Sequence, residues 1–185
     1  MIPVVCSQVE IHLFRRRRLR TEFLLLRRSP TRSLAGVWQP VTGGIEPGEA
    51  AYAAAVREVR EETRLAPLRW WSLEHLTIHY EAGSDLIRVV PVFVAEVAWT
   101  DAVHLSAEHD QYAFVPAMLA RRRVLWESQR RAMRAIAEEI LGGGANADAR
   151  EITARVAALR TAAPAKSRSG RRASDAARRK PRKGA

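Results

Sequence analysis

The sequence predicts an α/β domain, in which helices cover a sheet built from several separate stretches of the chain. Stretches of strand length, rich in alternating Val, Ile, Leu and Phe, lie on both sides of a longer segment rich in Ala, Glu and Arg. A second segment with apolar residues at helical spacing follows the last of these stretches. Strands, a helix, further strands and a closing helix are typical of a layered α/β domain.

The first 41 residues predict three strands. Residues 4–14 and 22–27 alternate in the way that half-buried strands do, and the charged residues 15–21 between them predict a turn. Residues 30–36 predict a loop because Pro and Gly bound them, and residues 37–41 form a third short stretch of strand character.

Residues 50–64 predict a helix, because they contain many Ala, Glu and Arg residues and no Gly or Pro. At 100° per residue, one narrow stripe of this helix is expected to face the core: Tyr52, Val56, Val59 and Thr63. Three carboxylates lie on another side: Glu58, Glu61 and Glu62. The small Ala51, Ala54 and Ala55 lie near that side and are expected to leave open space above it.

The second half predicts a strand pair and a closing helix. Residues 70–80 and 87–97 read as two strands around a turn at residues 83–85, and residues 112–115 read as a further strand. Residues 123–141 predict a helix with this apolar-side set: Leu125, Gln129, Met133, Ile136 and Ile140.

Three Gly residues at 142–144 predict the end of the main domain, so we expect a domain over residues 1–141 and a Gly-rich linker with a short helix over residues 142–161. Residues 162–185 hold nine Lys and Arg residues against one Asp and no large apolar side chain, which predicts a disordered basic tail. Of the net charge of +11, the tail carries +8, which leaves +3 for residues 1–161.

Several features predict a cytoplasmic protein. Cys6 is the only cysteine, which excludes an internal disulfide and favours a reducing compartment. The apolar run at the N-terminus precedes the Arg residues 15–18, the reverse of the order in a signal peptide. No apolar stretch approaches the roughly 20 residues of a membrane span.

The carboxylates of the first helix predict a metal site. Glu58 and Glu62 stand four residues apart and stack one turn above each other, where their charges repel unless a cation joins them. Carboxylate oxygens suit Mg2+, and Mn2+ is also possible. Arg57 can orient a neighbouring carboxylate, most simply Glu49. The alternative is a solvated helix face with weak i,i+4 ion pairs.

Residues 43–65 resemble the Nudix box, Gly-x5-Glu-x7-Arg-Glu-U-x-Glu-Glu-x-Gly-U, where U is a bulky aliphatic residue. The fixed positions that match are Gly43, Glu49, Arg57, Glu58, Val59, Glu61, Glu62 and Leu65, and Arg64 replaces the second Gly. The resemblance implies a Nudix α/β/α sandwich with a mixed sheet. It also implies a Mg2+-dependent pyrophosphohydrolase acting on a nucleoside diphosphate linked to another group.

Three segments outside the box resemble the dihydroneopterin triphosphate and dATP pyrophosphohydrolase branch of this family. They are residues 38–43, which read W-Q-P-V-T-G, residues 108–112, which read E-H-D-Q-Y, and Trp126 with Ser128. This resemblance implies a dNTP or dihydroneopterin triphosphate as substrate, hydrolysed to a monophosphate and pyrophosphate.

The resemblance implies a role for each matching residue. The metal ligands are expected to be Glu58, Glu61, Glu62, Glu108 and the Gly43 carbonyl. The catalytic groups are expected to be Glu58, Glu61, Glu108 and Arg57. The substrate-binding residues are expected to be Arg27, Trp38, Thr42 and Ser128. For some of these the structural alternative stays open: a solvated Glu108, a solvated Arg27, or a core or rim position for Trp38.

Two further functions stay open. One is a Nudix hydrolase of ADP-ribose, a dinucleoside polyphosphate or an oxidised nucleotide, since the box handles only the diphosphate. The other is a nucleic-acid-associated protein that uses its basic tail for nonspecific contacts, although that tail lacks interleaved aromatic residues. The expected binding partner is a small nucleotide-like molecule. We expect no association with a membrane, and we expect the chain to be a monomer or a homodimer.

Overall fold

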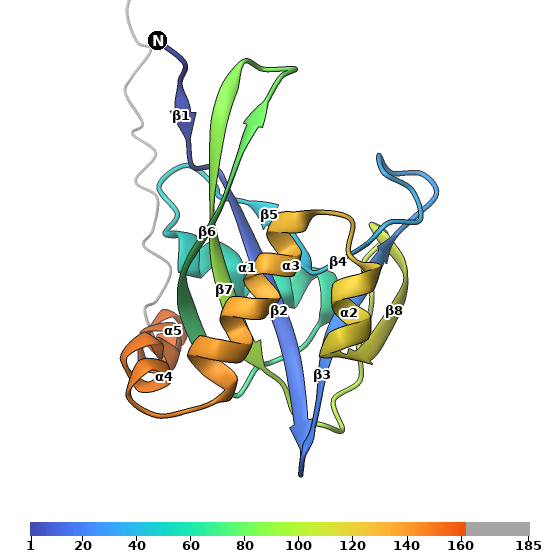
Figure 1. Cartoon of the computed structure of the whole chain (residues 1–185), viewed down its shortest axis with the longest axis vertical. Coiled ribbons are helices and arrows are strands. Elements are labelled where there is room, and N and C mark those ends of the chain that lie inside the picture. Colours follow the sequence, from blue (N-terminus) through green and yellow to red (C-terminus); the bar gives the residue numbers. More distant parts are fainter. Residues whose placement is uncertain (162–185) are drawn as a thin grey trace, which may run out of the picture.

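The computed structural model describes residues 1–161 (Figure 1). Its strands are β1 Val4–Val5, β2 Gln8–Arg17, β3 Arg20–Arg28, β4 Trp38–Gln39, β5 Val41–Gly44, β6 Arg69–Glu81, β7 Leu86–Glu96 and β8 His109–Pro116. Its helices are α1 Ala51–Thr63, α2 Ala117–Arg123, α3 Glu127–Ile136, a π-helical turn Ala137–Leu141, α4 Ala145–Arg150 and α5 Thr153–Thr161. The expected disordered tail lies outside the described residues.

The strands of residues 1–161 form one eight-stranded mixed sheet, as expected for an α/β fold. Strand β2 lies at its centre, parallel to β7 and antiparallel to β3 and β5. Strand β6 extends one edge by pairing with β7, and β8 pairs with β3. The central position of β2 brings the short strand β5 beside the middle of the sheet.

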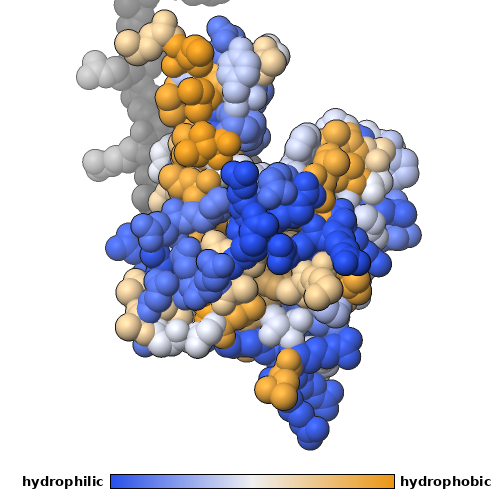
Figure 2. Space-filling model, viewed as in Figure 1, coloured by the Kyte–Doolittle hydropathy of each residue, from blue (hydrophilic) through white to orange (hydrophobic). Residues whose placement is uncertain are grey.

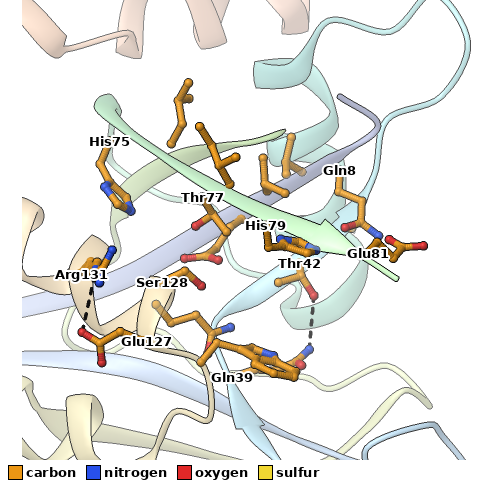
Figure 3. A pocket seen from close by; sticks show the side chains of 18 of the residues that line it. Gln8, Gln39, Thr42, His75, Thr77, His79, Glu81, Glu127, Ser128 and Arg131 are labelled. Atoms are coloured by element: carbon orange, nitrogen blue, oxygen red, sulfur yellow. Dashed lines mark hydrogen bonds and ion pairs between the residues drawn. The ribbon is translucent and has the colours of Figure 1, made fainter. Parts of the chain in front are cut away.

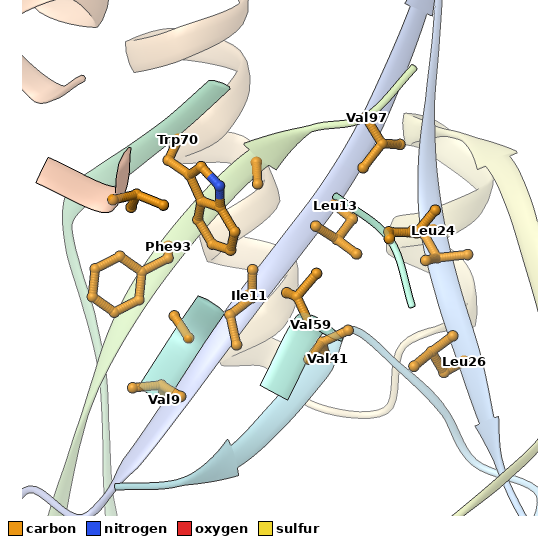
Figure 4. Close-up of a cluster of buried hydrophobic side chains, with 14 of the residues drawn as sticks. Val9, Ile11, Leu13, Leu24, Leu26, Val41, Val59, Trp70, Phe93 and Val97 are labelled. Carbon is orange, nitrogen blue, oxygen red and sulfur yellow. The ribbon is translucent and has the colours of Figure 1, made fainter. Parts of the chain in front are cut away.

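Helices cover both faces of this sheet and bury two separate apolar clusters. Val9, Ile11 and Leu13 of β2 pack with α1 on one face (Figure 4). The alternate residue Phe14 packs with Trp71 and with α3 on the other face. Since successive strand residues point to opposite faces, β2 contributes to both clusters. This arrangement confirms the expected α/β/α sandwich.

Helix α1 confirms the expected helix almost to the residue. It ends at Arg64, which adopts the left-handed conformation with φ 59° and ψ 9°. Gly adopts the left-handed conformation at lower cost than other residues. Arg64, which replaces the second Gly of the box, nevertheless keeps the backbone geometry that a Gly would have at this helix end. The open space expected above the Ala residues is wrong, because Ala54 and Ala55 are buried in the core and let α1 lie close to the sheet.

The first hairpin differs from its expected boundaries. Strands β2 and β3 pair as far as Arg17 and Arg20, so the turn is shorter than residues 15–21. Arg16 and Arg20 pair with Glu96 and Glu22, which lets charged side chains remain within strands. The hairpin tip, at the bottom of Figure 1, projects as a mainly hydrophilic surface around an exposed Leu19 (Figure 2).

Two other expected elements are divided. The strand expected over residues 37–41 splits into β4 and β5 at Pro40, which has no N–H to donate to a ladder. The helix expected over residues 123–141 begins only at Glu127, because Val124 and Trp126 are extended and Val124 forms a bridge with Trp38. Leu125 is consequently exposed and lies outside the helix.

Residues 142–161 pack back on the sheet. Helices α4 and α5 contact β6, α5 also contacts α1, and Val156 is buried in the cluster beneath α1. Residues 142–144 therefore form a short connection between the π-helical turn and these packed helices. The expected domain division at residue 141 stays a prediction. None of the helices within residues 1–161 is long and apolar enough to cross a membrane.

Candidate active site

A hollow of about 310 Å³ is lined by all five residues expected to bind metal. Strand β5, helix α1 and the loop before β8 provide its wall: Thr42, Gly43, Gly44, Glu58, Glu61, Glu62, Ser106 and Glu108. We call this group the acid hollow. The helix places three carboxylates on one side, and the loop brings Glu108 to them across 46 residues of sequence.

Glu62 is the most buried of these carboxylates, and its Oε2 has no hydrogen-bond partner within the described residues. Burial, followed by the charges of Glu58 and Glu108, raises the pKa of Glu62 to about 9. His109 Nδ1 lies 3.8 Å from Glu62 Oε2. Burial lowers the pKa of His109, so its imidazole is neutral near pH 7 and forms no ion pair with Glu62.

Arg57 binds three carboxylates around the acid hollow. Its Nε and Nη2 donate to the two oxygens of Glu49 at 3.0 and 2.9 Å, as expected from the sequence. Its Nη1 donates to Glu58 at 2.7 Å and to Glu61 at 3.3 Å, and its Nη2 also donates to the Gly44 carbonyl at 2.7 Å. Arg57 therefore fixes α1 to strand β5 and partly neutralises the carboxylates.

Gly43 allows the Glu58 carboxylate to reach the backbone of β5. A Cβ atom on Gly43 would lie 1.9 Å from the Glu58 carboxyl carbon, closer than real Cβ contacts. The neighbouring Gly44 has open space at the same position. The first Gly of the box is thus required by contact with the carboxylate, and not by an unusual backbone angle.

The donors around the acid hollow fit a divalent cation. Four carboxylates and a backbone carbonyl are the hard oxygen ligands that Mg2+ and Mn2+ take, and the unpartnered Glu62 oxygen is available to bind such an ion once its carboxyl group loses the proton. Within residues 1–161, no three His, Cys, Asp or Glu side chains already converge on one point. The Glu58 carboxylate instead contacts Arg57.

A larger cavity of about 920 Å³ adjoins the acid hollow. The two share Thr42, Gly43 and Gly44 of β5 as a common wall. Figure 3 shows Thr42 from β5, Thr77 from β6 and Ser128 from α3 around this cavity. Thr42 accepts a hydrogen bond from Gln39 at 3.3 Å. Two of the four expected substrate-binding residues, Thr42 and Ser128, are therefore brought together.

The other two lie outside both cavities. Arg27 makes a paired hydrogen bond to Asp110 at 2.8 and 2.7 Å, so its guanidinium is already occupied on an exposed sheet surface. Trp38 is partly buried against the cluster beneath α3, with Arg123 over its ring. The bridge between Trp38 and Val124 holds the ring at this position, and a role of Trp38 in substrate binding stays a prediction.

Sequence reasoning missed most of the larger cavity. Its wall includes the half-exposed Trp126 and the strand residues Glu10, His75 and Thr77. Of these, Trp126 belongs with Ser128 to the segment that resembles the substrate-contacting region of the branch. Glu10 could have been found from the sequence, since a charged residue at a core-facing position of an apolar strand is unusual.

The fold and the acid hollow define a class of protein. The model of the NUDIX domain matches residues 8–136, and the chain belongs to the NUDIX family. Hydrolases of this family are among the solved structures described next.

Two curated relatives are similar to this chain. The octanoyltransferase of Myxococcus xanthus is 33% identical over 129 residues, which cover 69% of this chain and 36% of that protein. The chain thus spans about a third of that relative's length. The asymmetrical bis(5'-nucleosyl)-tetraphosphatase of Caenorhabditis elegans is 32% identical over 117 residues, which cover 59% of this chain and 78% of that protein.

Three solved structures share the fold. A NUDIX hydrolase from Listeria monocytogenes has a TM-score of 0.62 at 24% identity and covers 72% of this chain and 92% of its own. The Ap4A hydrolase of C. elegans has a TM-score of 0.60 at 26% identity, and the match covers 75% of this chain and 100% of the hydrolase. The dihydroneopterin triphosphate pyrophosphohydrolase of E. coli has a TM-score of 0.59 at 19% identity, and the match covers 76% of this chain and 100% of the E. coli chain.

Proposed function

We propose that this chain hydrolyses the diphosphate bridge of a nucleoside polyphosphate with the help of Mg2+. The observation that carries the proposal is the buried Glu62 oxygen, which has no partner among the described residues although three further carboxylates line the same hollow. A site that gathers negative charge in this way suits a cation and the phosphates that come with it.

The residues divide the chemistry between them. Glu58, Glu61, Glu62, Glu108 and the Gly43 carbonyl would hold the metal, which would polarise the phosphate and lower the pKa of an attacking water. A carboxylate of the acid hollow accepts the proton of that water, and Glu108 and Glu61, the more exposed of the four, suit this role. Arg57 keeps Glu49 and Glu58 in place, so it acts as a positioning residue.

The larger cavity gives the substrate's remaining group a place beside the phosphates. Ligand cavities usually have volumes of about 300–1,000 Å³, and this cavity falls within that range. With a dNTP or dihydroneopterin triphosphate bound in this way, the products are a monophosphate and pyrophosphate. Thr42 and Ser128 would then contact the group next to the phosphates.

A dinucleoside polyphosphate is the second candidate substrate. The observation that favours it is the similarity to the C. elegans bis(5'-nucleosyl)-tetraphosphatase, both in sequence and in fold. In this case the larger cavity would take one nucleoside, with the phosphate chain beside the acid hollow. The products, a nucleoside triphosphate and a monophosphate for a tetraphosphate, distinguish it from the first candidate.

A hydrolysis screen tests the proposal. The purified chain is incubated with Mg2+ and a dNTP mixture, dihydroneopterin triphosphate, ADP-ribose or Ap4A, and the products are separated by chromatography. We expect metal-dependent cleavage of at least one compound, with loss of cleavage on chelation. Absence of cleavage for every compound, or cleavage that survives chelation, would contradict the proposal.

Mg2+ is expected to stabilise the folded chain. A ligand at 100 times its Kd stabilises by about 2.7 kcal/mol, which corresponds to roughly 5–10 °C in Tm for a chain of this size. The measurement is a thermal melt with and without Mg2+ for the wild type, Glu58→Gln and the exposed control Glu138→Gln. We expect the shift in the wild type and the control and a much smaller one in Glu58→Gln. Equal shifts in Tm for all three proteins would mean that Mg2+ does not stabilise the chain through the acid hollow, which would contradict this prediction.

A further inference from the structure

The larger cavity has a polar floor that the expected site residues do not explain. Glu10, Thr77 and Gln129 line it, yet they are only 4%, 5% and 3% exposed. The Oγ1 of Thr77 and the Oε1 of Gln129 have no hydrogen-bond partner within the described residues. Buried polar atoms are costly to leave unpaired, so they indicate a ligand that pairs with them.

Glu10 is held in place from below. Its Oε1 lies 2.6 Å from Nε2 of His12, which is 1% exposed and two residues along the same strand. Within residues 1–161, the second oxygen of Glu10 takes no side-chain hydrogen bond. Strand register places Glu10 beside Thr42 of β5, next to the acid hollow. The pair therefore fixes a carboxylate in the floor and leaves one oxygen to accept from a ligand.

The oxygens of the floor that are left without a partner accept hydrogen bonds. The second carboxylate oxygen of Glu10 only accepts, the Gln129 amide oxygen accepts beside an NH2 group that donates, and the Thr77 hydroxyl both donates and accepts. A ligand that pairs with the Glu10 and Gln129 oxygens must therefore present N–H groups on one edge. Guanine and pterin rings do so, with a ring N–H beside an exocyclic amino group. Adenine has a ring acceptor next to its amino group, and hypoxanthine has the ring N–H without the amino group.

The walls suit a flat ring. The half-exposed Trp126 and Tyr80 line the same cavity, together with the apolar Leu76, Ile78 and Val90. Aromatic side chains next to a few fixed polar groups are a usual way to bind a heterocycle by stacking and by its hydrogen-bonding edge.

We propose that the cavity floor selects a heterocycle with a ring N–H beside an amino group, read by the Glu10 carboxylate and the Gln129 amide, with His12 as the positioning residue of Glu10. This inference rests on the proposed function, since it names the class of base that the same enzyme accepts. It predicts guanine- or pterin-bearing substrates over adenine-bearing ones.

The test compares kcat/KM for GTP, ITP, ATP and dihydroneopterin triphosphate with Mg2+. ITP differs from GTP only by the missing amino group, which isolates the proposed contact. A site that leaves a buried acceptor unpaired discriminates by about 10- to 100-fold, so we expect GTP to exceed ITP and ATP by this factor. The pterin compound shares the edge, and its rate relative to GTP identifies which ring the cavity prefers.

Glu10→Gln is expected to lower the GTP-to-ITP ratio by at least about tenfold, because with its amide oxygen beside His12 the new side chain turns an NH2 group, which donates and does not accept, toward the ligand. His12→Ala should lower the same ratio less, through a misplaced carboxylate. Glu96→Gln, on the neighbouring strand and outside both cavities, is the control and should keep the wild-type ratio. Equal ratios in the wild type and in Glu10→Gln would overturn the inference.

Binding without turnover separates this inference from the proposed function. Calorimetry with GMP, IMP and AMP and the wild-type chain should give a Kd for GMP about tenfold or more below the others. Metal-dependent cleavage with no base preference overturns the inference and leaves the hydrolase intact. Selective GMP binding without cleavage of any compound supports the inference and overturns the proposed function. Equal or absent binding of all three monophosphates overturns the inference.

Discussion

Glu62→Gln is expected to lower kcat by about a thousandfold while the chain keeps its fold. Loss of a metal ligand or of a proton-accepting carboxylate removes roughly 10²- to 10⁴-fold from a rate, and Glu62 is the most buried of the four carboxylates in the acid hollow. A neutral amide of the same shape suits its buried position, because burial already favours the neutral form of Glu62. The measurement is kcat at saturating Mg2+, together with a thermal melt.

Glu138→Gln is the matched control for this experiment. The residue lies in the π-helical turn after α3, is exposed and contacts neither cavity. We expect the control to retain wild-type kcat, so that a loss in Glu62→Gln is assigned to the position and not to the change of charge. Near wild-type turnover in Glu62→Gln would remove Glu62 from the chemistry.

Gly43→Ala is expected to reduce turnover by about a hundredfold or more and to destabilise the fold. The new methyl group would lie 1.9 Å from the Glu58 carboxyl carbon, so either Glu58 or strand β5 must move. Overpacking of this kind costs typically 1–3 kcal/mol, and an ångström-scale displacement near reacting groups can cost about 10²-fold in rate. The measurements are the free energy of unfolding from a urea titration and kcat.

The adjacent Gly44 supplies the control for stability. It lies in the same strand, has open space at its Cβ position and does not have a positive φ. The free energy of unfolding of Gly44→Ala should therefore lie within about 0.5 kcal/mol of the wild-type value, as is usual for surface substitutions. If both variants lose the same stability, the cause is the strand and not the contact with Glu58.

The sequence predicted the acid hollow well because most of it comes from one helix. Glu58, Glu61 and Glu62 are fixed relative to each other by helical spacing, and Arg57 and Glu49 are close in the chain. The relative positions of these residues can be predicted without knowing the order of the strands in the sheet. Glu108 is distant in sequence, and only its resemblance to the E-H-x-x-Y segment linked it to the helix. The strand and helix types were predicted by their periodicity, and their ends were set by tertiary contacts.

The larger cavity could not be predicted in the same way, because six elements contribute to it. Glu10 and Thr77 belong to strands that are not adjacent in the sheet, and Gln129 belongs to a helix on one face of it. Their proximity depends on strand order, which periodicity does not give. Trp38 and Trp126 are equally plausible stacking residues by type, and only the bridge between Trp38 and Val124 decides which one faces the cavity.

Strand β5 has a consequence for how this sequence can vary. Its pairing with β2 sets Val9 opposite Gly43 and Glu10 opposite Thr42. Because side chains alternate, inserting or deleting one residue would exchange the two faces of the strand. A side chain would then meet Glu58, and Thr42 would leave the larger cavity. During divergence, this short segment therefore tolerates changes of residue type at several positions, but hardly any change of length.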